Sequence, residues 1–164
     1  MIKKQVLMKK LIAVRQGSED IVAHHEPKGN YVKEASAVLD ANTKIIFIMH
    51  GASRGAEKYL NDWLPLAQDR NVVLIAPEFS KESYPEYVYL MMGTERGKLL
   101  KDQSLYLTDS LGLLFDYFKA KLKLSTSTFR LYGHSGGSQF VHRYLLLSDE
   151  LRVEKAVMAN AGFY

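Results

Sequence analysis

The stretch Phe129-Arg-Leu-Tyr-Gly-His-Ser-Gly-Gly-Ser-Gln-Phe-Val141 decides the fold of this 164-residue chain. Its first part, Phe129–Tyr132, predicts a buried strand, and apolar residues at helical spacing predict a helix over 140–147. Between them, Gly133-His-Ser-Gly-Gly137 matches G-x-S-x-G, in which a serine occupies a sharp strand-to-helix turn. Glycines around Ser135 relieve the clashes that side chains would make there. We therefore expect the Ser135 hydroxyl to project above a sheet as a nucleophile.

Other segments predict the rest of that sheet. Lys44–Met49 and Asn71–Ala76 are continuous apolar runs, which are typical of strands buried on both faces. Val153–Ala161 predicts a later strand, and Ile21–His25 a weakly marked first one. Strands that alternate with helices through right-handed crossovers predict a three-layer α/β/α sandwich with a mostly parallel sheet.

Two helices are expected between these strands. Over 107–122 the apolar residues fall on one face, with acidic and basic residues on the other. The segment Ala56–Gln68 is weaker, because Pro65 would interrupt an interior turn. We expect a short turn there and then a helix capped by Asp62, with Pro65 in its first turn.

Composition excludes several classes of protein. The chain is 47% hydrophobic and 24% charged, which is typical of one globular domain, and the absence of cysteine excludes disulfides, thiolate metal sites and a cysteine nucleophile. No apolar run approaches the roughly 18 residues of a membrane span. The five basic residues within 1–15 exceed the net charge of +4, so the remainder is close to neutral. We interpret 1–19 as a basic N-terminal tail and expect no nucleic-acid binding.

The same tail bears on localisation. Lys9 and Lys10 split its apolar residues, so no signal-peptide core forms. The chain as given is interpreted as cytoplasmic, and secretion of a longer parent protein stays open.

A second motif, His50-Gly51-Ala52, follows the strand Lys44–Met49 at the sheet edge where open α/β sheets bind ligands. Acyl transfer needs two backbone N–H donors for the developing oxyanion. We expect Gly136 to supply one donor and Ala52 the other, with His50 holding the loop by hydrogen bonds. The alternative is that His50-Gly51 only turns the chain.

In these features, residues 42–164 resemble the α/β-hydrolases, most closely the bacterial serine esterases and polyhydroxyalkanoate depolymerases. The resemblance implies that Ser135 attacks a carboxylic ester, small or polymeric, through an acyl-enzyme, without a cofactor or metal. It also implies supporting roles for Gly51, Gly133, His134 and Gly137. In this family a histidine serves as the general base and an acid orients it, both after the serine in the chain.

The chain departs from the family at this point, since it reaches Tyr164 after a single further predicted strand. His142 lies about 10 Å along the predicted helix and faces away. His134 is expected to point into the protein, His50 to hold its loop, and His24 and His25 to lie on the surface. No histidine is a good candidate for the base.

We therefore interpret 20–164 as a partial α/β-hydrolase domain that ends after its sixth strand. Such a chain would be weakly active or inactive, and its exposed sheet edge would favour self-association. Two alternatives stay open: a complete but non-catalytic binding or interaction module, and a base supplied by a separate chain or second copy. Substrate identity and oligomeric state are left open as well.

Other motifs are not supported. The glycines of 51–58 lack phosphate-loop spacing, and no dinucleotide fingerprint occurs. His24, His25 and Glu26 are adjacent, and neighbours on a strand point to opposite faces, so no metal site is expected. Tyr84, Tyr87 and Tyr89 either line a substrate pocket or pack against the domain.

Overall fold

The computed structural model of the chain describes residues 12–16, 19–23, 39–40, 42–67 and 70–162. The candidate metal residues His24, His25 and Glu26, and most of the predicted basic tail, lie outside these ranges. Within them, none of the helices is both long and apolar enough to cross a bilayer.

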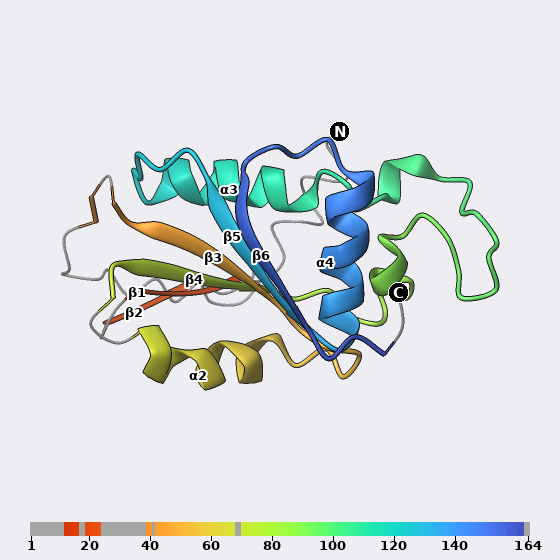
Figure 1. Cartoon of the computed structure of the whole chain (residues 1–164), viewed down its shortest axis with the longest axis horizontal. Helices are drawn as coiled ribbons and strands as arrows, with labels where there is room; N and C mark the ends of the chain where they lie inside the picture. The colour runs from red at the N-terminus through yellow and green to blue at the C-terminus, as the bar shows by residue number, and fades with distance from the viewer. Residues whose placement is uncertain (1–11, 17–18, 24–38, 41, 68–69, 163–164) are drawn as a thin grey trace.

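The molecule is built on one six-stranded sheet with the order β2-β1-β4-β3-β5-β6 (Figure 1). The strand β1 pairs antiparallel with β2 and β4, whereas β3, β4, β5 and β6 run parallel. The strands are β1 (Ile12–Gln16), β2 (Glu19–Ala23), β3 (Lys44–Met49), β4 (Val72–Pro77), β5 (Phe129–His134) and β6 (Val153–Ala159).

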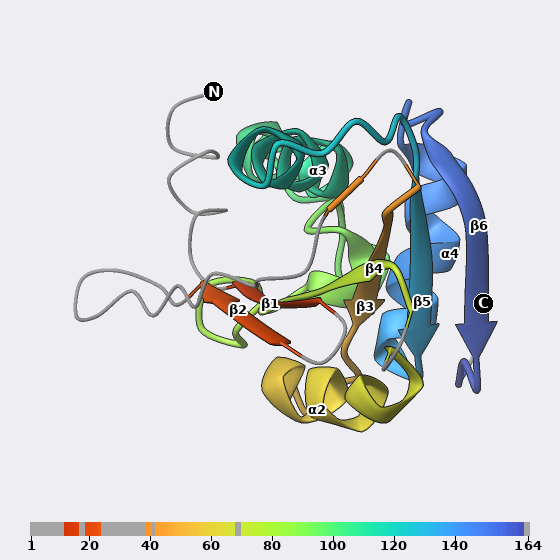
Figure 2. The ribbon, with the colours of Figure 1, turned by 90° about the vertical axis from the view of Figure 1, so that its left-hand side faces the viewer.

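Helices cover both faces of this sheet, so the predicted three-layer sandwich is confirmed (Figure 2). One face carries α2 (Ala56–Ala67), and the other carries α3 (Ser110–Lys121) and α4 (Gly136–Leu147). Two short 3-10 helices, η1 (Tyr87–Tyr89) and η2 (Gln103–Leu105), lie in the connection between β4 and α3.

Strand alternation produces two separate cores. On β3, Ile45, Phe47 and Met49 are fully buried under α3 and α4, while Ile48 is buried on the α2 side. The ring of Phe129 on β5 packs edge-on against Phe47, with centroids 5.3 Å apart. These packed layers fix the carboxyl ends of β3 and β5 beside each other, since Met49 pairs with Gly133.

Most of the predicted elements are present. The strand over 44–49 is confirmed with the same limits, and β4, β5 and β2 differ from prediction by one or two residues at their ends. The last strand ends at Ala159, before the predicted Ala161, because Asn160 turns the chain with φ 51°. The helix α4 begins at Gly136, directly after the serine.

Two predictions were wrong in part. Residues 56–67 form one continuous helix, because Pro65 lies in its last turn, where it removes a single backbone hydrogen bond while Leu60 and Ala67 stay buried. Ile12–Gln16, which the prediction assigned to the tail, forms β1 between β2 and β4.

The connection between β4 and α3 packs against the domain. Tyr84 and Tyr87 are buried in the core below α4, and Leu107 is anchored by a 2.8 Å hydrogen bond from its N–H to the carbonyl of Leu90. The sequence left two roles open for these tyrosines, lining a substrate pocket or packing. In the structure Tyr84 and Tyr87 pack against the domain.

Candidate active site

The turn between β5 and α4 places Ser135 in an unusual backbone conformation, with φ 55° and ψ −119°. A residue with a β-carbon adopts this region only when its surroundings impose it. Here the Ser135 N–H donates to the carbonyl of Ala159 at 3.0 Å, and the Ser135 carbonyl accepts from the N–H of Gln139 at 3.2 Å. The serine is therefore held between β6 and the first turn of α4.

The turn needs glycines because backbone atoms approach each other closely here. A β-carbon on Gly133 would overlap the carbonyl of Gly137, and one on Gly137 would overlap the carbonyl of Met49 at the end of β3. Only glycine fits at these two positions, so Gly133 and Gly137 bring α4 against both parallel strands.

The two predicted oxyanion donors lie next to each other. A β-carbon placed on Gly136 would be 3.1 Å from the backbone nitrogen of Ala52, and one placed on Gly51 would be 3.5 Å from the β-carbon of Ser135. The loop after β3 therefore borders the serine turn directly. Gly136 is also the first residue of α4, whose N-terminus carries partial positive charge.

His50 connects this loop to the segment after β4. It is fully buried; its Nδ1 lies 3.1 Å from the Gly51 carbonyl, and its Nε2 lies 3.0 Å from the N–H of Phe79. The Phe79 N–H can only donate, so Nε2 accepts and Nδ1–H donates to Gly51. Because the carbonyl of Gly51 is held on the His50 side, the N–H of Ala52 in the same peptide plane points the opposite way.

Electrostatics keep His50 neutral. Burial lowers the pKa of His50 from 6.5 to about 4, and the positive charge of Arg54 lowers it further, against the effect of the Gly51 hydrogen bond. At neutral pH both ring nitrogens are thus engaged in holding backbone.

Arg54 and Tyr87 hold His50 and the segment after β4 in place by further contacts. The guanidinium of Arg54 donates to the carbonyls of Phe79 at 2.6 Å and Pro85 at 3.2 Å, and it lies 4.6 Å from the Tyr87 ring centroid. The Tyr87 hydroxyl donates to the His50 carbonyl at 3.0 Å. Sequence reasoning missed both roles, because neither residue belongs to a motif and their partners are distant in the sequence.

His134 precedes the serine but points to the α2 side of the sheet. Its Nδ1 lies 2.8 Å from the Tyr59 hydroxyl and its Nε2 lies 3.4 Å from the Asn160 amide nitrogen. His142 lies seven residues after Ser135 on α4, about 10 Å along the helix axis. Among the described residues, no histidine therefore has a ring nitrogen placed to take a proton from Ser135.

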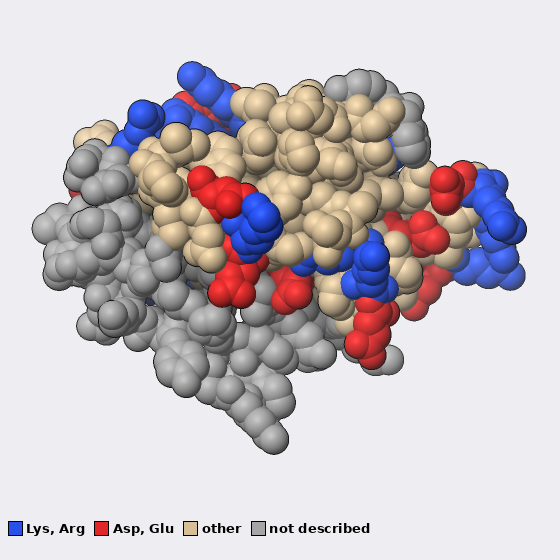
Figure 3. Space-filling model, turned by 90° about the horizontal axis from the view of Figure 1, so that it is seen from below, with Lys and Arg blue, Asp and Glu red and all other residues tan. Residues whose placement is uncertain are grey.

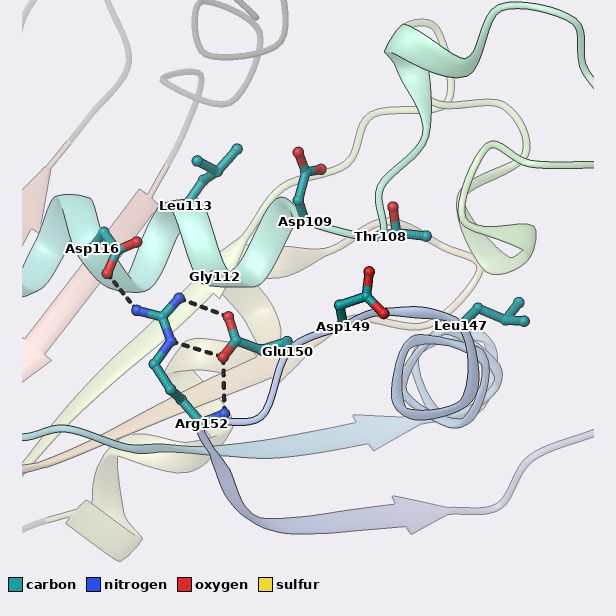
Figure 4. Close-up of a pocket in the computed structure, with 9 residues that line it drawn as sticks. All are labelled: Thr108, Asp109, Gly112, Leu113, Asp116, Leu147, Asp149, Glu150 and Arg152. Carbon is teal, nitrogen blue, oxygen red and sulfur yellow. Dashed lines mark hydrogen bonds and ion pairs between the residues drawn. The ribbon is translucent and has the colours of Figure 1, made fainter.

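A separate hollow of about 270 Å³ lies at the other end of α4, beside Leu147 (Figure 4). There Arg152 forms hydrogen bonds with Glu150 at 2.7 Å and an ion pair with Asp116. The 12-residue helix α4, about 18 Å long, separates this hollow from Ser135. Its ion pairs fix the segment between α4 and β6, and they do not belong to the serine site.

Comparison with solved structures identifies the fold. The chain matches poly(aspartic acid) hydrolase-1 from Sphingomonas sp. KT-1 with a TM-score of 0.69 and 32% identity, covering 77% of this chain and 48% of that one. It matches LpqC, a poly(3-hydroxybutyrate) depolymerase from Bordetella parapertussis, with a TM-score of 0.67 and 24% identity, covering 79% and 44%. No family model and no curated protein matched the sequence.

The chain thus spans less than half the length of each of these two hydrolases. Both likenesses are to the fold, which in this chain is the six-stranded sheet with helices on both faces. The chain is therefore an α/β-hydrolase-like protein, with the fold of that family over the residues described.

Proposed function

We propose that the chain is a serine hydrolase that cleaves carboxylic esters through an acyl-enzyme, with Ser135 as the nucleophile. The observation that carries the proposal is the strained backbone of Ser135 at the start of α4, with Ala52 N beside Gly136. Strain of this kind persists where the surrounding structure imposes it, and it clusters at functional sites.

The chemistry follows from this arrangement. Ser135 Oγ would attack the ester carbonyl carbon, and the carbonyl oxygen would gain negative charge as a tetrahedral intermediate forms. The N–H groups of Gly136 and Ala52 would donate to that oxygen in a site with no need to reorganise. The bond between the carbonyl carbon and the alcohol oxygen then breaks, and the alcohol leaves with the proton that Ser135 gave up, carried across by solvent or by an added base. Water next attacks the acyl-enzyme carbonyl, and the acid is released as Ser135 regains a proton.

A polymeric substrate fits the proposal: one solved neighbour is named for poly(3-hydroxybutyrate), a polyester, and the other for poly(aspartic acid), whose units are joined by amide bonds. The described residues place no base beside Ser135, so we expect weak activity from this chain by itself. Removing a triad member from a serine protease still leaves about 10³–10⁴-fold catalysis over water, contributed by the oxyanion hole and binding.

The alternative is a non-catalytic binding or interaction module, in which the turn at Ser135 has only a structural role. It is favoured by the engagement of His50 and His134 with other groups.

Covalent labelling with a fluorophosphonate, followed by intact mass, tests the proposal. We expect slow addition of one phosphonyl group to the parent chain and none to Ser135→Ala. The matched control is Ser138→Ala, because Ser138 lies three residues further on and is fully buried. Added imidazole should accelerate labelling of the parent and of Ser138→Ala, because it supplies the missing base. If the parent chain gains no adduct even with imidazole, Ser135 is no nucleophile and the non-catalytic alternative is favoured.

A further inference from the structure

The hydroxyl of Tyr59 on α2 contacts both loops that make up the serine site. It lies 2.8 Å from His134 Nδ1, within the turn that carries Ser135. A β-carbon on Gly51 would lie 2.9 Å from the same hydroxyl and 3.5 Å from the Ser135 β-carbon. One side chain from the opposite layer of the fold thus bonds to the residue before Ser135 and lies beside Gly51, in the loop that carries the Ala52 N–H.

His134 has a second partner on its other side. The Asn160 amide nitrogen lies 3.4 Å from Nε2, and Asn160 turns the chain at the end of β6 with φ 51°. The residue before it, Ala159, accepts the Ser135 N–H at 3.0 Å. The His134 ring therefore lies between α2 and the end of β6, next to the hydrogen bond that holds the serine backbone.

These contacts favour one tautomer of the neutral ring. An amide nitrogen donates, so Asn160 donates to Nε2, and Nδ1 must then carry the proton and donate to the Tyr59 oxygen. The Tyr59 oxygen accepts this bond, and a phenylalanine at the same position would leave the Nδ1–H of His134 without an acceptor.

We propose that Tyr59 is a positioning residue of the serine site. Through His134 it holds the turn that carries Ser135, and its hydroxyl occupies the space beside Gly51 in the loop that carries the Ala52 N–H. The catalytic consequence rests on the proposed function, whereas the positioning itself can be measured without activity.

The test compares Tyr59→Phe with Tyr132→Phe. The control removes a hydroxyl from the same side of the sheet, where the Tyr132 ring packs against Trp63 with centroids 4.7 Å apart. Two properties are measured by NMR: the ring ¹⁵N shifts of His134, which report its tautomer and the hydrogen bonds of its ring nitrogens, and the hydrogen exchange of the Ser135 amide.

We expect the His134 ¹⁵N shifts to change in Tyr59→Phe and Ser135 amide exchange to accelerate by about fivefold or more, the effect of losing one hydrogen bond. In Tyr132→Phe both should match the parent. Hydrogen exchange of the core Phe47 amide is the reference. If this amide accelerates as much as that of Ser135, the cause is global unfolding, and the inference is overturned. Unchanged His134 shifts, or equal Ser135 exchange in both variants, would also overturn it.

Labelling separates this inference from the proposed function. If the parent reacts with the fluorophosphonate, Tyr59→Phe should lower the maximal labelling rate at saturating probe by about fivefold or more, with little change in the probe concentration at half-saturation. An unchanged maximal rate would contradict the inference. If the parent does not react, the proposed function fails, and the His134 shifts and Ser135 exchange still decide the role of Tyr59.

Discussion

Replacing His50 with glutamine should remove a pH-dependent part of the folding stability. The imidazole is fully buried, and both ring nitrogens bond to backbone. Burial lowers its pKa from 6.5 to about 4 in the folded chain. Between these two pH values the unfolded chain binds a proton that the folded chain does not, so stability falls as the pH is lowered from 6.5 towards 4.

The magnitude follows from the two pKa values. A difference of one bound proton changes the unfolding free energy by about 1.4 kcal/mol per pH unit. From pH 7.5 to pH 4 the parent should therefore lose about 3 kcal/mol of unfolding free energy through His50. Glutamine keeps one donor and one acceptor but does not titrate, and at pH 7.5 we expect it to cost about 1–3 kcal/mol through imperfect hydrogen bonds to buried backbone.

Urea unfolding of parent and variant across this pH range measures the effect. Carboxylates held by arginines, such as Glu150 beside Arg152, titrate in both proteins and cancel in the difference. The stability difference between parent and His50→Gln should shrink or reverse as the pH falls to 4. A difference that is constant with pH, or an NMR titration of His50 near 6.5, would refute the reasoning.

Three further substitutions test other parts of the structure. Gly137→Ala drives a methyl group into the carbonyl of Met49, so urea unfolding should show a loss of about 3 kcal/mol or more of unfolding free energy. An unchanged midpoint would contradict the close approach. Arg152→Ala leaves the half-buried Glu150 without its guanidinium partner and should lower the unfolding free energy by about 1–3 kcal/mol. Arg152→Lys should recover part of this loss. Equal stability of the parent and both variants would argue against the ion pair. Val157→Lys places a charge on the outermost strand and should lower self-association in sedimentation at several concentrations; a parent that stays monomeric would refute the expected association.

The last of these rests on the surface at β6. Among the described residues, β6 pairs with β5 alone, and Figure 2 shows its outer side uncovered by any of the described elements. Large apolar side chains are exposed near it, with Val157 at 55% and Leu151 at 94%. Seen from below, the upper middle of the molecule is tan, with Lys, Arg and acidic side chains beside it at the upper left (Figure 3). We propose that a second copy associates through this edge.

The parallel part of the sheet could be predicted because its strands are buried on both faces. Such strands consist of nearly uninterrupted apolar residues, as in Lys44–Met49, and turn residues end them. The serine turn could be predicted as well. Its glycines are required because backbone atoms approach closely within a few residues and at the adjacent strand. Local patterns of this kind carry most of the information about the fold.

Elements that depend on distant partners could not be predicted. The strand β1 contains Arg15 and follows a basic segment, and its identity as a strand comes from pairing with β4, which lies much later in the sequence. The continuity of α2 through Pro65 depends on burial of neighbouring residues against the sheet. The contact between Tyr59 and His134 joins two segments far apart in the sequence, and no spacing rule indicates it.

The most direct test of a nucleophilic Ser135 is to locate the phosphonyl group after fluorophosphonate treatment in the presence of imidazole. Trypsin releases a peptide between Arg130 and Arg143 that contains both Ser135 and Ser138, and tandem mass spectrometry distinguishes the two. We predict the added mass on Ser135 alone. An adduct on Ser138, on the exposed Ser53 or on Tyr59, or no adduct at all, would contradict a nucleophilic Ser135.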